Sequence, residues 1–354
     1  MNELRPGSPR EAGISSEHLD ILLDKCREWV NTGATPALSV LAARKGIVFM
    51  HGSWGRLTPG PDSAPVKADS RFGMASCSKP VTAAAVMSLV EEGRLALHHP
   101  LQEYLPAFRG PSAERVTIRH LLSHTSGLPS STDSEIINAA EQGLDYEPGT
   151  KVVYSSAAYD LLGEVVEKIS GKSFEDFAQQ QIFAPLGMDN TTFIHMGLDR
   201  DRCVQARPGT TYDWPQEYEG TTSASSSLWS TAYDMGIFLH TFLNKGCYGH
   251  YRLLSEACVE KMTRDQTPGI PRELVDGVPI PSAGLGWFLL GSGRFPNYPS
   301  SFSMSSFGHS GASGAFIWVD PSYNLVGAFL FTKVKEGVRP LDCFVDRLMD
   351  CILT

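Results

Sequence analysis

Strand-like segments lie at both ends of this sequence of 354 residues, and mainly helical segments lie between them. Near the start, two apolar runs meet at Arg44-Lys45-Gly46, which predicts a hairpin between residues 36–43 and 46–54. Near the end, Gly, Asp-Pro and Asn turn signals separate four short apolar runs, at residues 284–290, 307–310, 315–319 and 325–332. The order predicts an α+β fold, with one antiparallel sheet built from N- and C-terminal segments and flanked by helices.

Helical spacing of apolar residues marks the rest of the chain. A first helix is predicted over residues 14–31, and a second begins near Ser76 and ends at Gly93. Further helical patterns cover residues 118–123, 159–170, 173–181, 231–242 and 340–352. Thr231, with Asp234 three residues later, resembles a capping box at the start of one of them.

These patterns predict two lobes within one domain of about residues 12–350. An α/β lobe would combine residues 1–93 and 284–354, and residues 94–283 would form a mainly helical insertion lobe. A cleft between the lobes is the expected place for a binding site.

Charge and composition exclude several classes of partner. Lys and Arg number 30 against 39 Asp and Glu, for a net charge of −9, and no basic stripe appears, so nucleic acid is not expected. No window approaches the ~18 apolar residues of a membrane span. The start lacks the apolar stretch of a signal peptide, and seven cysteines include no C-x-x-C pair. We therefore expect a soluble cytoplasmic protein, while its oligomeric state is not predicted.

The candidate nucleophile is Ser76, three residues before Lys79 at the predicted start of a helix. Residues i and i+3 share a helix face, so the two side chains can approach each other. A serine hydroxyl needs a nearby base, and a lysine becomes one when burial lowers its pKa. The alternative is a helix cap followed by a solvated lysine, because the S-x-x-K pattern alone is common.

Two later motifs carry residues that suit the same chemistry. Tyr154 begins a Tyr-Ser-Ser motif and could relay a proton to a leaving group, although most tyrosines simply pack in a core. His309-Ser310-Gly311 begins a predicted inner strand, where Gly311 would let a substrate lie close to the backbone. The amides of Ala312 and Ser76 could then form an oxyanion hole.

The order of these motifs resembles the serine β-lactamase and penicillin-binding protein family, which includes β-lactamase-like carboxylesterases. The resemblance extends beyond the three motifs, and its class C-like signatures cover most of the chain. They are Val116–Leu128, Pro148-Gly149, Pro185-Leu186-Gly187-Met188 and Leu228-Trp229-Ser230-Thr231-Ala232 with Asp234.

The resemblance implies a role for each matching residue. Ser76 would be acylated, Lys79 would be its base, Tyr154 would carry the second proton, and the amides of Ser76 and Ala312 would be the oxyanion donors. Ser156, His309, Ser310 and Gly311 would contact substrate. His124 in the Ser-His-Thr-Ser-Gly stretch is structural in the family, so no catalytic role is expected for it.

Two positions depart from the family's lactamase pattern. Ser156 stands where an Asn often donates to an amide of the substrate, and such a contact is worth ~1–3 kcal/mol. His309 replaces a lysine that many β-lactamases use for a substrate carboxylate, and histidine is mostly neutral at pH 7. His309 either hydrogen-bonds toward Tyr154 or packs at the strand end. Both departures favour esters or uncharged acyl substrates.

Other candidates receive a simpler interpretation. Cys77 is expected to face the core, and His98-His99 lacks a third metal ligand, so we expect no metal and no cofactor. Aromatic residues in later loops are either core or the rim of an acyl pocket, namely Tyr212, Trp214, Tyr218, Trp229, Trp287, Phe295 and Tyr298.

The sequence thus predicts a serine hydrolase that forms an acyl-Ser76 intermediate, most simply a carboxylesterase acting on small ester or acyl substrates. Three alternatives remain. One is an amide-directed enzyme, such as a weak β-lactamase, D-amino-acid peptidase or DD-carboxypeptidase. Another is an acyltransferase, and the third is an inactive binding protein on the same fold.

Overall fold

A computed structural model describes residues 3–60, 62–128, 143–193, 198–205, 222–293, 298–332 and 339–353. Its main sheet has the order β1-β3-β2-β14-β13-β12-β11-β10, and each neighbouring pair is antiparallel except β1 and β3. The strands are β1 (Arg5–Pro6), β2 (Ala37–Arg44), β3 (Ile47–Gly55), β10 (Ser282–Ala283), β11 (Phe288–Leu289), β12 (Phe307–Ser310), β13 (Ala315–Asp320) and β14 (Leu325–Phe331). The predicted α+β fold, with a sheet from both ends of the chain, is confirmed.

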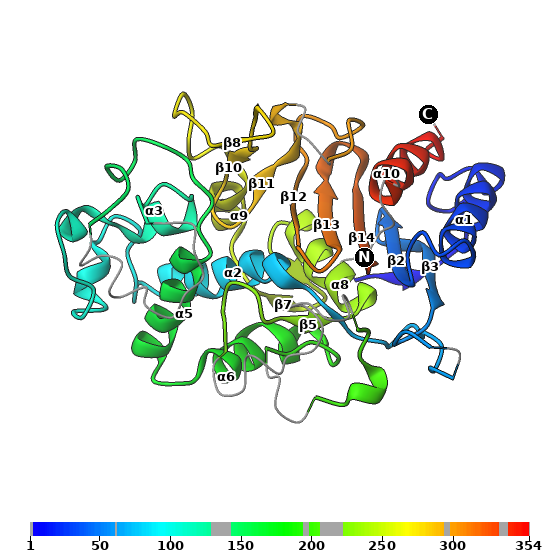
Figure 1. The fold of residues 1–354 in the computed structure, drawn as a ribbon, viewed down its shortest axis with the longest axis horizontal. Helices are drawn as coiled ribbons and strands as arrows, with labels where there is room; N and C mark the ends of the chain where they lie inside the picture. The colour runs from blue at the N-terminus through cyan, green and yellow to red at the C-terminus, as the bar shows by residue number, and fades with distance from the viewer. Residues whose placement is uncertain are drawn as a thin grey trace.

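The two ends of the chain meet where β2 pairs with β14 along the middle of the sheet. Lys45 and Gly46 have φ values of +55° and +76°, and this left-handed pair closes the predicted hairpin between β2 and β3. A bridge between Ile14 and Ile352 joins the ends again beside the sheet. Blue and red segments therefore lie side by side in Figure 1.

One strand prediction is wrong in part. Residues 284–290 were expected to be a single strand, but the chain turns there between the short strands β10 and β11. Gly286 has a φ of +85°, which an ordinary side chain disfavours. A Cβ at Gly284 would lie 2.2 Å from the carbonyl oxygen of Met262, so the backbone passes too closely for a larger residue. The apolar run is therefore a buried turn that leads into the short strand β11, and not one continuous strand.

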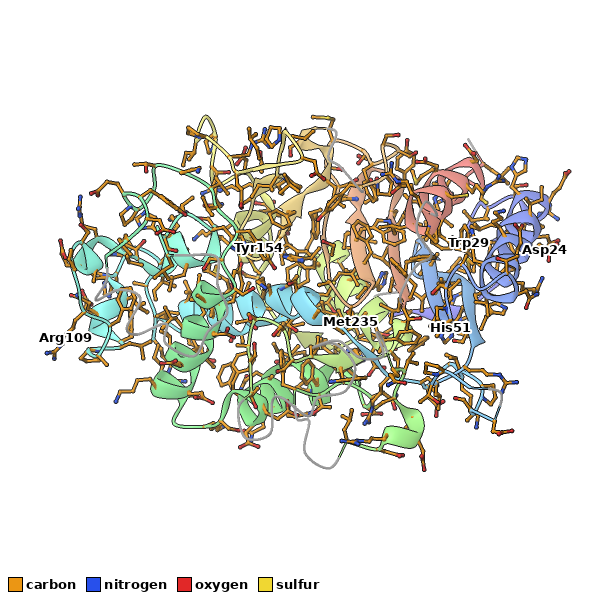
Figure 2. All side chains as sticks on the ribbon, viewed as in Figure 1. Asp24, Trp29, His51, Arg109, Tyr154 and Met235 are labelled. Atoms are coloured by element: carbon orange, nitrogen blue, oxygen red, sulfur yellow. The ribbon has the colours of Figure 1, made fainter. Side chains whose placement is uncertain are left out.

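Helices cover both faces of the sheet. Helices α1 (Ser16–Asn31) and α10 (Pro340–Asp350) pack together on one face, and α8 (Ala232–Leu243) packs on the other. In α1, Trp29 is buried against Phe329 of the sheet, while Asp24 points outward (Figure 2). The predicted helices at both ends are confirmed, with α10 ending two residues earlier than expected.

The remaining helices gather at the end of the sheet beyond β10 and beneath it (Figure 1). They are α2 (Ser78–Glu91), α3 (Ile118–Leu122), α5 (Ala157–Ser170), α6 (Phe174–Ala178), α7 (Ala184–Leu186) and α9 (Glu256–Thr263). Short strand pairs connect them, namely β4 (Phe72–Gly73) with β5 (Trp229–Ser230), β6 (Cys247–Tyr248) with β7 (Tyr251–Arg252), and β8 (Leu274–Val275) with β9 (Val278–Pro279). Helix α2 is buried on all sides and packs against α5, so it forms the centre of this region.

The lobe boundary drawn from the sequence stays a prediction, but α8 packs on the sheet although it lies within residues 94–283. Thr231 caps α8 as expected, accepting from the Asp234 amide at 3.1 Å. The Asp234 carboxylate instead accepts from Asn190 and Thr191, each at 2.8 Å, so the reciprocal half of the box is absent. Among the described helices, none combines the length and the hydropathy that crossing a bilayer requires.

Candidate active site

Ser76 lies on a tight turn between the buried strand β4 and the buried helix α2. A single 3₁₀ turn (Ala75–Cys77) precedes α2, and Ala75 has a φ of +44°, which is uncommon for a residue with a Cβ. The Ser78 hydroxyl fixes the turn, since it donates to the Ala75 carbonyl at 2.6 Å and accepts from the Leu228 amide at 3.1 Å. Backbone strain of this kind persists where surrounding contacts impose it, and here it presents the Ser76 hydroxyl to a cavity.

Lys79 lies directly behind Ser76 and is fully buried. Its ammonium nitrogen Nζ is 3.2 Å from the Ser76 hydroxyl, 3.2 Å from the Ser156 hydroxyl and 3.1 Å from the Ser225 carbonyl oxygen. Burial lowers the Lys79 pKa to about 7. A substantial fraction of the side chain is therefore a free amine near neutral pH, which can accept the Ser76 proton.

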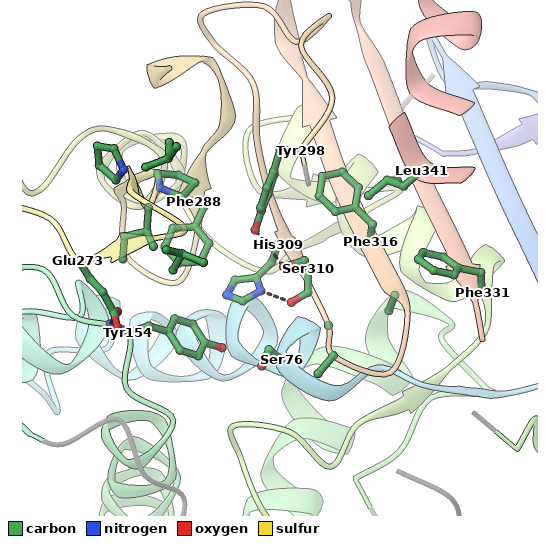
Figure 3. Close-up of a pocket in the computed structure, with 18 residues that line it drawn as sticks. Ser76, Tyr154, Glu273, Phe288, Tyr298, His309, Ser310, Phe316, Phe331 and Leu341 are labelled. Atoms are coloured by element: carbon green, nitrogen blue, oxygen red, sulfur yellow. Dashed lines mark hydrogen bonds between the residues drawn. The ribbon is translucent and has the colours of Figure 1, made fainter. Parts of the chain in front are cut away.

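Tyr154 precedes α5 and directs its hydroxyl toward Ser76 (Figure 3). Burial raises the pKa of the phenol, which the nearby Ser76 and Ser156 hydroxyls only partly counter, so Tyr154 is a neutral proton donor at rest. Lys79 Nζ lies 4.8 Å from the centre of the ring. The Tyr154 amide donates to the Glu273 carboxylate at 3.0 Å, which fixes the start of the motif.

His309 lies on β12 across the site from Tyr154. Its Nδ1 is 2.8 Å from the Ser310 carbonyl oxygen, an acceptor, so Nδ1 carries the proton and Nε2 is the bare acceptor. Burial, followed by the charge of Lys79, lowers the His309 pKa to about 3. The ring packs on Phe288 at 5.0 Å between centroids, and on Tyr154 at 6.2 Å without a hydrogen bond within the described residues. Of the two expectations for His309, packing describes this geometry.

The turn after β12 brings a second backbone segment against the nucleophile. Gly311 donates to the Ala315 carbonyl at 2.7 Å, and the Ser313 hydroxyl donates to the Gly73 carbonyl at 2.5 Å. A Cβ at Gly311 would lie only 2.2 Å from the Met74 carbonyl oxygen, so this close approach requires glycine. Ala312 follows directly and lines the same cavity as Ser76, which suits two amides that act on one oxyanion.

The cavity above Ser76 has a volume of about 560 Å³ and walls that are mostly apolar. Aromatic and aliphatic residues extend it on both sides of Ser76, namely Val275, Val278, Pro279, Ile280, Phe288, Tyr298, Phe316, Phe331 and Leu341. Glu273 is the acidic residue among its described lining, and no lysine or arginine lines it. The size suits a small organic substrate.

Several expected site residues lie elsewhere or have another contact. The Ser156 hydroxyl accepts from Lys79, and Ser156 is not among the residues that line the cavity, so its contact with a substrate stays a prediction. Cys77 faces the core, where its thiol donates to the His309 carbonyl at 3.3 Å. His124 accepts from the Ser155 amide at 3.2 Å, a structural contact beneath Tyr154.

The aromatic candidates divide in the same way. Tyr298 lines the cavity, and its hydroxyl lies 2.9 Å from that of Ser310, whereas Trp229 and Trp287 are buried elsewhere. Tyr212, Trp214, Tyr218 and Phe295 lie outside the described residues. The His99 ring contacts Glu103 and Tyr104, and no cluster of three or more metal-ligating side chains occurs in the described part of the chain.

Sequence reasoning missed two acidic residues. Asp160 on α5 accepts from Ser223 and Ser225 beside the Lys79 network, and Glu273 lies in the cavity wall. The Asp160 spacing gave a signal, because i+4 from Ser156 on one helix places both side chains on the face toward α2. No local pattern marks Glu273, which reaches Tyr154 from 119 residues away.

Comparison with known proteins finds a family model and relatives that match most of this chain. The family model described as Beta-lactamase matches residues 22–346. N-acetylmuramyl-L-alanine amidase of Bacillus subtilis is 28% identical over 77% of this chain and 70% of its own length. A putative D-alanyl-D-alanine carboxypeptidase of Escherichia coli is 25% identical over 95% and 87%. Among solved structures, a family VIII carboxylesterase aligns with a TM-score of 0.79 at 20% identity, covering 96% of this chain and 98% of its own, which shows a shared fold.

Proposed function

This chain belongs to the β-lactamase family of serine hydrolases, and within that family we propose that it is a carboxylesterase acting on small uncharged esters. The observation that carries the proposal is the charge of the cavity. A carboxylate-bearing substrate would find no lysine or arginine among the described lining residues, and His309 is neutral. Glu273 would repel it. An uncharged ester meets neither penalty in the apolar cavity.

The residues around Ser76 can complete such a reaction. The Ser76 oxygen attacks the ester carbonyl as its proton passes to the Lys79 amine, and a bond forms between that oxygen and the carbonyl carbon. The amides of Ser76 and Ala312 stabilise the negative oxygen of the intermediate. The bond to the alkoxy oxygen then breaks, and that oxygen leaves as an alcohol with the Tyr154 proton, which Lys79 replaces.

Water then releases the acyl group. It attacks the acyl carbon while the Lys79 amine takes one of its protons, and the bond to the Ser76 oxygen breaks as that oxygen receives the proton from Lys79. The products are a carboxylic acid and the free hydroxyl of Ser76. Capture of the acyl group by another alcohol or an amine in place of water would make the chain an acyltransferase.

An amide-directed activity is the second candidate, because the two relatives carry the names of an amidase and a putative D-alanyl-D-alanine carboxypeptidase. We further propose a cytoplasmic location, which the seven free thiols support. Such a location disfavours cell-wall substrates, since these lie outside the membrane.

A panel of three substrates separates these activities. Purified protein should hydrolyse short-chain p-nitrophenyl esters faster than nitrocefin or D-alanine p-nitroanilide, and a fluorophosphonate probe should add mass to Ser76. Ser76→Ala should abolish both the ester hydrolysis and the labelling. Ser88→Ala on the same buried helix should leave them unchanged, because that hydroxyl donates only to the Ala85 carbonyl among the described contacts. Turnover of the lactam or the anilide alone would overturn the esterase proposal.

A further inference from the structure

Asp160 lies in the first turn of α5, with its carboxylate directed at the segment of residues 223–225. Its Oδ1 accepts from the Ser223 hydroxyl at 2.8 Å and the Ser225 amide at 3.0 Å, and its Oδ2 accepts from the Ser225 hydroxyl at 3.1 Å. Three donors on two oxygens favour the ionised carboxylate. Burial raises the pKa of Asp160, and these hydrogen bonds lower it.

The Ser225 residue held by Asp160 also touches the base. Its carbonyl oxygen accepts from Lys79 Nζ at 3.1 Å, so amide, hydroxyl and carbonyl of one residue link the carboxylate to the amine. The preceding carbonyl, of Ala224, accepts from the Thr82 hydroxyl on α2 at 2.6 Å. Ala224 also packs against α5, where a Cβ at Gly163 would meet it at 2.6 Å. The segment is therefore fixed between the helix that carries Lys79 and the helix that carries Asp160.

Several elements around Lys79 present titratable groups to it. The 3₁₀ turn presents the Cys77 thiol, and the start of α5 presents Asp160 with the rings of Tyr154 and Tyr159 at 4.8 and 5.7 Å. Burial, followed by the charge of Lys79, lowers the pKa values of His124 after α3 and His309 on β12, so both are neutral. Among these titratable groups around Lys79, Asp160 is the carboxylate.

We propose that Asp160 is a positioning residue for the Ser76–Lys79 pair, which holds the Ser225 carbonyl on the Lys79 amine and places a compensating negative charge beside it. This inference rests on the proposed acyl-Ser76 chemistry. It explains how Lys79, which is fully buried and forms no salt bridge among the described residues, can still take up a proton.

The sign of the effect follows from two opposing influences on Lys79. Burial lowers the pKa of Lys79 and the Asp160 charge raises it, and the resulting pKa is about 7. Asp160→Asn removes the charge and keeps the shape, although the amide nitrogen of Asn cannot accept from a serine hydroxyl. Lys79 in this variant should lose its proton at a lower pH, by roughly one unit for a neighbouring opposite charge. Acylation of Ser76 should then extend to lower pH, with a reduced plateau rate because the amine is a weaker base.

The experiment measures the rate at which a fluorophosphonate labels Ser76 between pH 5.5 and 9, followed by intact mass. In this reaction the Ser76 oxygen forms a bond to phosphorus, the phosphorus–fluorine bond breaks to release fluoride, and the hydroxyl proton passes to Lys79. Asp160→Asn should move the acidic midpoint down by roughly one pH unit. Asp160→Glu should return it toward the original value. Glu164→Gln, an exposed position one turn along α5, removes the same charge and should not move it.

The outcomes are distinguishable from failure of the proposed function. If the unaltered protein does not label at all, the acyl-Ser76 chemistry itself is wrong. If it labels and Asp160→Asn lowers the rate equally at every pH, Asp160 has only a structural role and the inference fails. An equal shift in Glu164→Gln would also overturn it, since the effect would then be one of overall charge.

Discussion

Replacing Gly311 with alanine should disable the site while leaving the fold largely intact. The added Cβ would lie 2.2 Å from the Met74 carbonyl oxygen and 3.4 Å from the Ala315 Cβ. Non-bonded carbon contacts are comfortable near ~3.5 Å, so the β12 turn or the strand before Ser76 must move by about 1 Å. A shift of that size can cost about 100-fold in rate, and loss of one oxyanion donor costs a comparable factor in kcat. We therefore expect kcat for a p-nitrophenyl ester to fall about 100-fold, with KM little changed.

The assay combines ester kinetics with a thermal unfolding curve for each variant. Gly93→Ala is the matched control, because Gly93 has a φ of +70° but open space around the position of a Cβ. That variant should lose about 1 kcal/mol of stability from backbone strain and keep its kcat. A Gly311→Ala protein that unfolds cooperatively and retains kcat within threefold of the original would refute the assignment of the Ala312 amide.

Two further predictions test charge in the cavity and in the core. Glu273→Gln keeps an acceptor for the Tyr154 amide but removes the negative charge, so kcat/KM for an ester that carries a carboxylate should rise about fivefold relative to a neutral ester. An unchanged ratio would remove the electrostatic argument for uncharged substrates. His240 is buried with no hydrogen-bond partner for either ring nitrogen within the described residues, and burial lowers its pKa to about 4. The unfolded chain then binds the extra proton between pH 6.5 and about 4, so stability falls as pH falls through that window, by about 2 kcal/mol at pH 5. His240→Leu should lessen that loss in urea titrations at pH 7.5 and pH 5, and an equal loss in both proteins would contradict the reasoning.

The main elements of the fold could be predicted because their signals are local. The β2–β3 hairpin needed only Lys45-Gly46, and helix α2 ends near Gly93 as its pattern indicated. The strand prediction for residues 284–290 was wrong in part because tertiary contacts decide the conformation there. Its apolar run looks like a strand, and only the approach of Met262 and the φ of Gly286 show why the chain turns there.

In the site, too, the residues in local motifs could be predicted and those from distant segments could not. Ser76, Lys79, Tyr154 and the turn after His309 could be proposed from short motifs, and the structure brings all of them to one cavity wall or directly beneath it. The partner of Ser156 could not be anticipated, since whether a hydroxyl faces substrate or Lys79 depends on how α5 rotates against α2. Glu273 and the apolar wall around Phe316 and Leu341 come from distant segments, so no spacing rule connects them to the nucleophile.

The polar groups nearest to Ser76 share one electrostatic condition that follows from burial. The same exclusion of water lowers the pKa values of Lys79 and His309 and raises that of Tyr154, which leaves a partly neutral base, a neutral imidazole and a neutral phenol. An acylation step that begins and ends with uncharged species suits such a surrounding, because the only charges it creates are the transient oxyanion and the Lys79 ammonium formed with it. A substrate that carries its own carboxylate would add a permanent charge, and no lysine or arginine among the described cavity residues would pair with it. The neutral groups around Ser76 therefore favour an uncharged ester. Asp160, which is linked to Lys79 through Ser225, supplies the countercharge at the step when Lys79 becomes protonated.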